Sequence, residues 1–133
     1  MKKSRNIFYW IATAWLALGM SSTAIVQILQ LEEEVKHTSL HLGYPLYLLH
    51  FIGLCKLAGV ITILVPKFVL LKEWAYAGFT FLMVGALISH AALRDEASAF
   101  FGPSLLLLLT FASWYLRPES RRINLKFSIS KQA

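Results

Sequence analysis

Four apolar stretches, each about 18 residues or longer, constrain the fold of this chain more than any other feature. About 20 helical residues cross the ~30 Å of hydrocarbon in a bilayer, so each stretch is a candidate transmembrane helix. The 133 residues are 57% hydrophobic and 15% charged, with a mean hydropathy of +0.60, unlike a water-soluble domain. We predict spans at about residues 7–31, 46–65, 74–93 and 99–116.

The connections between the spans predict an all-α fold, a transmembrane four-helix bundle. The connector between the second and third spans is short, and short connections join antiparallel neighbours. In the polar segment 31–45, one helical face carries Leu31, Val35, Thr38 and Leu42. This pattern predicts a short amphipathic outer loop helix that ends at Gly43 and Pro45. We expect residues 1–118 to form one membrane domain and residues 119–133 a basic cytoplasmic tail.

The lysines and arginines separate by membrane side. Of the thirteen, ten lie in the leader, the second connector and the C-terminal segment from Arg117 onward, two lie on the opposite side, and Lys56 lies within a span. The positive-inside rule therefore predicts that both termini are cytoplasmic, in a multi-pass protein of the bacterial inner membrane. The net charge of +6 then reflects orientation and not a nucleic-acid-binding stripe. The single cysteine, Cys55, excludes a CxxC thiol–disulfide oxidoreductase.

Several blocks of the sequence resemble a known family. They are LGYP (Leu42–Pro45), GLCKLAGVITILVP (Gly53–Pro66), KEWAYAGF (Lys72–Phe79), Gly85–Ala86 and Ser89–His90. These blocks resemble the DoxX-like family of small four-helix bacterial membrane proteins, and KEWAYAGF is the most specific. The resemblance covers roughly residues 7–118. It implies a four-span cytoplasmic-membrane protein in a wider group named for subunits of quinol oxidase and thiosulfate:quinone oxidoreductase complexes, and it carries over no catalytic residue.

Lys56 lies near the middle of the second span, roughly 15 Å from either end at ~1.5 Å per residue. A charge at the bilayer centre costs at least ~2.5 kcal/mol, so such residues usually face a bundle interior or a wet cavity. We predict that Lys56 extends toward the cytoplasmic side and is solvated there by the hydroxyls of Thr13, Thr80 and Thr110, or pairs with Glu73. A role in binding a ligand or handling protons is the alternative.

A second polar layer is expected at the outer ends of the spans. His50 and His90 lie near the outer ends of adjacent antiparallel helices, with Gln27 and Gln30 at the same level and Asp95 just above. Two facing histidines are most often interhelical hydrogen-bond partners. They could also hydrogen-bond a quinone headgroup, or, as the least favoured reading, ligate a b-type haem.

A metal site in the outer loop helix is a weaker hypothesis. Glu34, His37 and His41 share a helical face by their i, i+3, i+7 spacing. A carboxylate and two imidazoles at this spacing suit zinc or copper. We favour the simpler interpretation that these residues belong to a solvated loop helix, and we predict no resident metal.

The sequence thus predicts a non-catalytic accessory or quinone-like-ligand-binding component of redox or stress physiology. The alternatives are a small-solute or proton transporter that uses Lys56, and a purely structural partner subunit. The partners considered are the lipid bilayer, membrane oxidoreductase subunits and further copies of the chain, but not nucleic acid. The candidate ligand-binding residues are Lys56, His50, His90, Gln27, Glu73, Tyr76 and Thr80.

Overall fold

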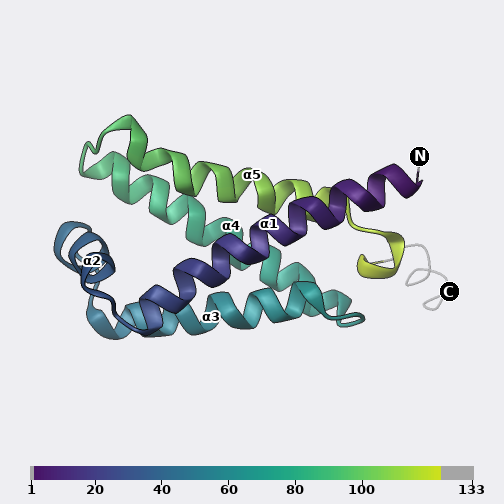
Figure 1. Cartoon of the computed structure of the whole chain (residues 1–133), viewed down its shortest axis with the longest axis horizontal. Coiled ribbons are helices and arrows are strands. Elements are labelled where there is room, and N and C mark those ends of the chain that lie inside the picture. Colours follow the sequence, from purple (N-terminus) through teal and green to yellow (C-terminus); the bar gives the residue numbers. More distant parts are fainter. Residues whose placement is uncertain (1, 124–133) are drawn as a thin grey trace, which may run out of the picture.

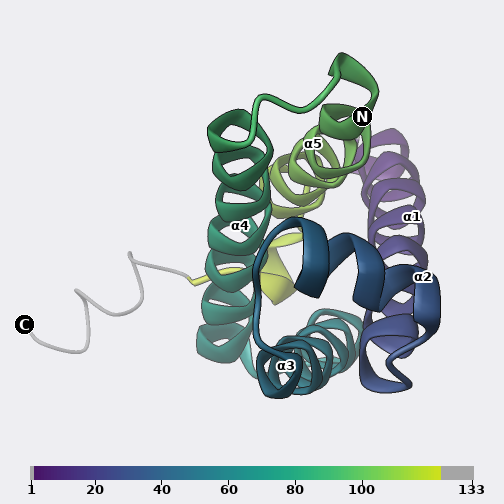
Figure 2. The same cartoon turned by 90° about the vertical axis from the view of Figure 1, so that its left-hand side faces the viewer.

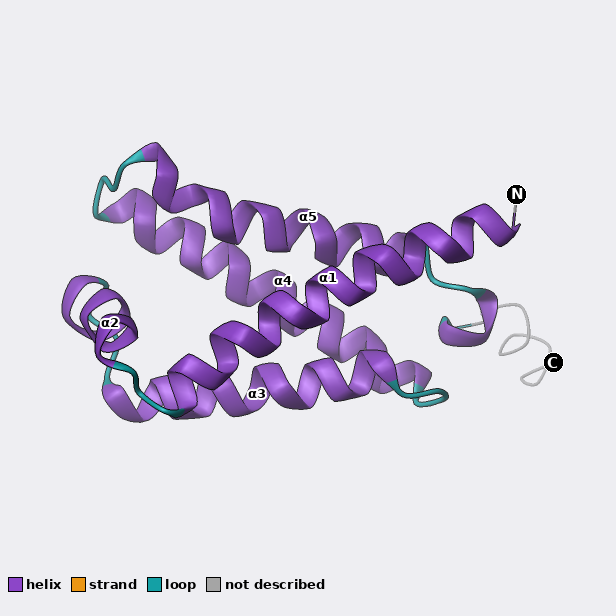
Figure 3. Cartoon of the chain, viewed as in Figure 1, coloured by secondary structure: helices purple, strands orange, loops and turns teal. Residues whose placement is uncertain are grey.

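The computed structural model describes residues 2–123, and this part of the chain is helical, without a strand (Figure 3). Four helices are long and apolar enough to cross a membrane, which confirms the predicted all-α fold with four spans. The long helices are α1 (Lys2–Ile28), α3 (Leu46–Leu64), α4 (Val69–Ala92) and α5 (Phe101–Tyr115). The short elements are α2 (Glu32–Glu34), η1 (Val35–His41), η2 (Ala97–Phe100) and η3 (Glu119–Arg121).

The four long helices form a ring, which is seen from one end in Figure 2. Helix α1 contacts α3 and α5, and α4 contacts the same two helices. One end of the bundle holds the N-terminus, the α3–α4 loop and the end of α5 (Figure 1). We call this the basic end, and its cations include Lys3, Arg5, Lys67, Lys72, Arg117, Arg121 and Arg122. The opposite end carries α2, η1 and η2, and we call it the loop-helix end.

At the basic end, cationic side chains donate hydrogen bonds to the last carbonyl oxygens of two helices. Arg5 Nη2 donates to the carbonyl oxygen of Tyr115 over 2.8 Å, at the end of α5. Lys72, which is completely buried, donates from Nζ to the carbonyl oxygens of Thr62, over 2.7 Å, and of Val65 at the end of α3. Since a helix leaves its last carbonyls unpaired and carries partial negative charge there, these contacts stabilise both helix ends.

The turn between α3 and α4 follows from its sequence. Proline disfavours helical backbone in the residue before it, and α3 ends at Leu64, two residues before Pro66. Lys67 and Phe68 then adopt positive φ angles of 67° and 52°, which reverse the chain. Helix α4 therefore begins at Val69, five residues before the predicted start of the third span.

An apolar core fills the middle of the bundle between the two ends. Its buried side chains are Leu16, Ala17, Met20, Val60, Ile63, Tyr76, Phe79 and Met83. Two glycines of α3 allow close packing around it. A Cβ atom at Gly59 would lie 2.7 Å from Cε1 of Phe79, and one at Gly53 would lie 2.9 Å from the carbonyl oxygen of Ala24. Small residues at such contacts are typical of membrane bundles.

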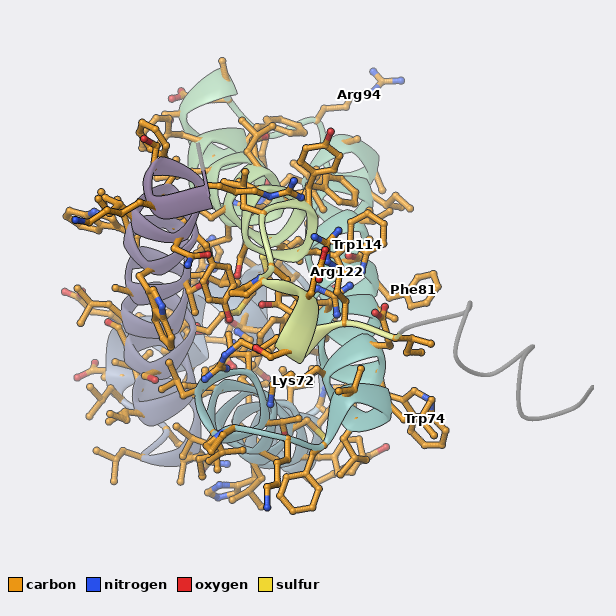
Figure 4. The ribbon with its side chains drawn as sticks, turned by 90° about the vertical axis from the view of Figure 1, so that its right-hand side faces the viewer. Lys72, Trp74, Phe81, Arg94, Trp114 and Arg122 are labelled. Carbon is orange, nitrogen blue, oxygen red and sulfur yellow. The ribbon has the colours of Figure 1, made fainter. Side chains whose placement is uncertain are left out.

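Large apolar side chains also cover the outside of the bundle. Trp74 and Phe81 of α4 point away from the other helices (Figure 4), with exposed fractions of 68% and 75%. Exposed side chains of this kind occur on all four long helices, and they include Trp15, Phe51, Phe81 and Leu108. An apolar exterior of this extent fits a helix bundle whose surroundings are lipid.

The loop helix differs from the amphipathic α-helix that the sequence predicts. Only Glu32–Glu34 forms an α-helical turn, and Val35–His41 continues as a π-helix. The backbone N–H of Leu42 donates to the carbonyl oxygen of His37, five residues back, over 3.2 Å. Gly43 then ends the segment with a φ of +82°. Because the π-helical turn is wider, the i, i+3, i+7 spacing no longer defines one face.

The predicted domain bounds are described only in part. Residues 2–118 contain all four long helices, and Glu119–Arg121 forms η3 beyond them. The remainder of the predicted basic tail, residues 124–133, lies outside the described residues.

Candidate functional site

A hollow of about 210 Å³ lies along the contact between α4 and α5, near the basic end. Ala77, Phe111 and Trp114 are exposed parts of its wall, so the hollow opens on the outer surface of the bundle. The residues that line it are Glu73, Tyr76, Ala77 and Thr80 from α4, and Thr110, Phe111 and Trp114 from α5. Three of them, Glu73, Tyr76 and Thr80, are candidate residues from the sequence.

Both carboxylate oxygens of Glu73 are held in place. Oε1 lies 2.6 Å from Nη2 of Arg117, and Oε2 accepts a hydrogen bond from Nε1 of Trp114 over 2.9 Å. Arg117 is only 3% exposed, and its guanidinium lies 5.3 Å from the ring centre of Tyr76. A largely buried ion pair needs its hydrogen bonds satisfied. The contacts of this pair hold Glu73 and Trp114 in place at one end of the hollow.

The expected ion pair between Glu73 and Lys56 is therefore wrong. Glu73 pairs with Arg117, which sequence reasoning had assigned only to the set of cytoplasmic basic residues. Arg117 follows the last residues of α5, and Nε of its side chain donates back to the carbonyl oxygen of Trp114 over 2.9 Å. An arginine one residue before Pro118, close to an aromatic pair, is the sequence signal that could have drawn attention to it.

Buried hydroxyl groups connect three helices beside the hollow. Tyr76 Oη lies 2.7 Å from Oγ of Ser113, and the same Oγ lies 2.6 Å from Oγ1 of Thr13. The hydroxyl of Tyr9 is also completely buried, and it has no partner within the described residues. Tyr76 thus joins the wall of the hollow to the polar interior near the basic end.

Two threonines that line the hollow have hydroxyl groups with acceptor capacity. The hydroxyl of Thr80 donates to the carbonyl oxygen of Tyr76 over 2.8 Å, and that of Thr110 donates to the carbonyl oxygen of Leu106 over 2.7 Å. Because each proton is used within its own helix, each hydroxyl oxygen is left with acceptor capacity. The side-chain hydrogen bond of Lys56 in the described part of the chain goes to Thr23. These threonines and Thr13 thus do not solvate Lys56, contrary to the prediction.

Lys56 extends toward the loop-helix end. Its side chain is buried, and Nζ donates to Oγ1 of Thr23 over 3.1 Å. The physical reason is packing and charge. The apolar core occupies the interior toward the basic end, whereas the carboxylate of Glu34 attracts the ammonium from the other side.

Glu34 joins Lys56 in a polar group that we call the lysine cluster. Its Oε1 accepts hydrogen bonds from Nε2 of Gln27, over 3.1 Å, and from Oγ1 of Thr38, over 2.7 Å. The cluster consists of Thr23, Gln27, Glu34, Thr38 and Lys56. It unites Lys56 and Gln27, which sequence reasoning had placed in separate layers.

The expected pair of facing histidines does not form. His50 is exposed on the outside of α3, whereas His90 is 3% exposed and lies inside. Nδ1 of His90 is 2.7 Å from Oδ2 of Asp95, and Nε2 of His41 is 2.8 Å from Oδ1 of the same carboxylate. The hydrogen bond from His90, assisted by that from His41, holds the pKa of Asp95 below its usual range.

The outer loop residues of the metal hypothesis are divided between these two groups. Glu34 belongs to the lysine cluster, and His41 binds Asp95. The ring centre of His37 lies 6.1 Å from that of His41 and 5.5 Å from that of His90. Among residues 2–123 no group of three or more histidine, cysteine, aspartate or glutamate side chains could hold a metal ion.

Comparison with known protein families matches residues 11–113 to the DoxX-like family. The chain belongs to this family. The match confirms the resemblance drawn from the KEWAYAGF block, and with the four apolar helices it identifies this DoxX-like chain as a multi-pass membrane protein. The matched residues include the hollow as far as Phe111 and the whole lysine cluster. No curated protein and no solved structure matches the chain.

Proposed function

We propose that this DoxX-like protein binds an amphiphilic molecule with a hydroxyl-bearing ring, of the quinol class, in the hollow between α4 and α5. The observation that carries the proposal is the set of acceptors in the wall, namely the hydroxyl oxygens of Thr80 and Thr110 beside the carboxylate of Glu73. A quinol donates hydrogen bonds through its hydroxyl groups, so it complements this wall.

The size and position of the hollow support the same ligand class. A volume of about 210 Å³ is below the ~300–1,000 Å³ of sites that enclose whole drug-sized molecules. It suits a single ring, with an alkyl tail outside the hollow along the apolar surface. Phe111 and Trp114 are exposed at the wall and offer aromatic faces to such a ring.

The proposed role is accessory and non-catalytic. We place the protein in the bacterial cytoplasmic membrane with antiparallel neighbouring spans and with the basic end on the cytoplasmic side, as the positive-inside rule indicates. The site would then lie near the cytoplasmic surface, where a redox enzyme of the membrane could exchange quinol with it. A transport role for Lys56 has less support, because the apolar core fills the interior between Lys56 and the basic end.

Equilibrium binding of decylubiquinol to the purified protein in detergent, under argon, tests the proposal. Replacing Thr80 and Thr110 by valine removes both hydroxyls at nearly constant shape. Since each hydrogen bond contributes ~1 kcal/mol, the double variant should bind roughly tenfold to thirtyfold more weakly. The quinone form, which cannot donate, should also bind more weakly than the quinol.

Thr62→Val is the matched control. Thr62 makes the same bond to its own helix, from Oγ1 to the carbonyl oxygen of Ala58 over 2.7 Å, but it lies on α3, outside the hollow. This variant should bind like the wild type. The absence of saturable quinol binding, or equal affinities for the wild type and the double variant, would refute the proposal.

A further inference from the structure

The lysine cluster is a second polar site, separate from the hollow and in the loop-helix half of the bundle. Lys56 is only 5% exposed. A lysine ammonium carries three N–H donors. Within residues 2–123, Lys56 makes one side-chain hydrogen bond, to Thr23. A buried ammonium with unused donors is costly unless other acceptors reach it.

Gln27 contributes an unused acceptor to the same cluster. Its Nε2 donates to the carboxylate of Glu34, which fixes the orientation of the amide because a carboxylate cannot donate. Oε1 therefore points away from Glu34, and it is buried without a partner in the described part of the chain. Gln27 itself is 8% exposed. A buried carbonyl oxygen without a donor costs about 1–3 kcal/mol.

The two charges in the cluster do not meet. The carboxylate of Glu34 accepts from Gln27 and Thr38, and it influences Lys56 only through space. One positive and one negative charge leave the cluster without net charge. A ligand of this cluster must then be neutral, and it must accept from the ammonium and donate to the amide oxygen of Gln27.

Access to the cluster differs at the two ends. Val60 and Ile63, one and two turns beyond Lys56 on α3, belong to the apolar core and separate the lysine from the basic end. Toward the other end the cluster is covered by α2 and η1, which lie across the bundle opening in Figure 2. This cover is short, π-helical and partly exposed.

We infer that Lys56, Gln27 and Glu34 form a hydrated site that binds water, or a neutral molecule of similar size that both donates and accepts hydrogen bonds. The site fills from the loop-helix end only. Bound water would accept hydrogen bonds from the unused donors of Lys56 and donate one to Oε1 of Gln27. Buried water usually has this role at polar sites. The site is independent of quinol binding in the hollow, so either can fail without the other.

Thiol labelling tests this inference with a reference at the same depth. Cys55 is exposed on the lipid-facing side of α3, directly beside Lys56. In sealed, oriented membrane vesicles, 2-aminoethyl methanethiosulfonate reacts with thiolates, which need water to form. Lys56→Cys, made together with Cys55→Ser, should be labelled at least tenfold faster than Cys55 in the wild type. With free cysteine on the opposite side of the membrane to consume any reagent that crosses it, this labelling should occur only when the reagent is added on the loop-helix side.

A second variant keeps the lysine in place in case its removal disturbs folding. Thr23→Cys with Cys55→Ser puts the thiol beside the ammonium, and it should also be labelled at least tenfold faster than native Cys55. Labelling of the interior thiols as slow as that of Cys55 would overturn the inference of a hydrated site. Faster labelling from the basic end would overturn the inferred direction of access.

Discussion

Arg117 and Glu73 form an ion pair of 2.6 Å across the contact between α4 and α5, and Arg117 is almost completely buried. The pair lies beside the hollow and holds Trp114 and Tyr76 around it, through the hydrogen bond from Trp114 and the guanidinium over the ring of Tyr76. One charged contact therefore supports both the stability of the bundle and the shape of the candidate site.

Arg117→Leu should destabilise the protein strongly, because it leaves the carboxylate of Glu73 partly buried without its partner. Breaking an enclosed pair costs about 3–5 kcal/mol, and the lower end applies here since the Glu73 side chain is 28% exposed. Unfolding in mixed micelles measures the change. Adding Glu73→Gln should recover part of the loss, whereas Lys67→Gln, an exposed site at the same end, should change little. If Arg117→Leu alone were as stable as the wild type, the pair would contribute nothing to the free energy of unfolding.

Gly59→Ala should destabilise the contact between α3 and α4. The new Cβ would lie 2.7 Å from Phe79, and such overpacking typically costs about 1–3 kcal/mol. Gly78→Ala is the control, because nothing lies within 4 Å of a Cβ atom there. That change should be neutral or stabilise α4 by up to ~1 kcal/mol. The same unfolding measurement compares the two, and equal effects would argue against close packing at Gly59.

Acid should weaken the contact between the loop helix and the end of α4. The pKa of Asp95 is lowered in the folded protein, chiefly by the hydrogen bond from His90. A lowered carboxyl pKa adds stability above its unfolded value, near 3.8, and this stability is lost as the pH falls through the folded value. Asp95→Asn should therefore lower Tm at pH 7, and the effect should shrink as the pH falls below 3.8 toward the folded pKa.

The control for this prediction is Glu96→Gln, at the exposed neighbouring acid. It removes the same charge without removing contacts to His90 and His41. Thermal unfolding in detergent across pH 3–7 checks both variants. If the two gave the same Tm shift at pH 7, the contribution of the histidine contacts to stability would be disproved.

The proposed topology predicts the activity of reporter fusions. Alkaline phosphatase folds only outside the bacterial cytoplasm, because it needs disulfides. Fused after residue 123, it should be inactive, and inserted near Gly43, between η1 and α3, it should be active. The opposite pattern would place the basic end outside and would require a different explanation for the distribution of lysine and arginine.

The sequence by itself determined the number of long helices, their apolar exterior and the family of the chain. These properties depend on local composition and on apolar runs of about 20 residues. Each of them can be recognised from one stretch of the sequence without knowledge of the rest. It also identified Glu73, Tyr76 and Thr80 as candidates, but the contacts expected of Glu73 and Thr80 with Lys56 do not form. The partner of each polar group was decided only by the tertiary structure.

Three cases show why the partners were not predictable. Lys56 is directed by the apolar core on one side and Glu34 on the other, and Glu34 and most of the core side chains belong to other elements of the chain. His50 and His90 have similar depths but different faces. Arg117 meets Glu73 across 44 residues of chain. Periodicity reports which residues of one helix share a face, whereas helix rotation and the π-helical turn of η1 decide which faces meet, because they depend on packing of the whole bundle.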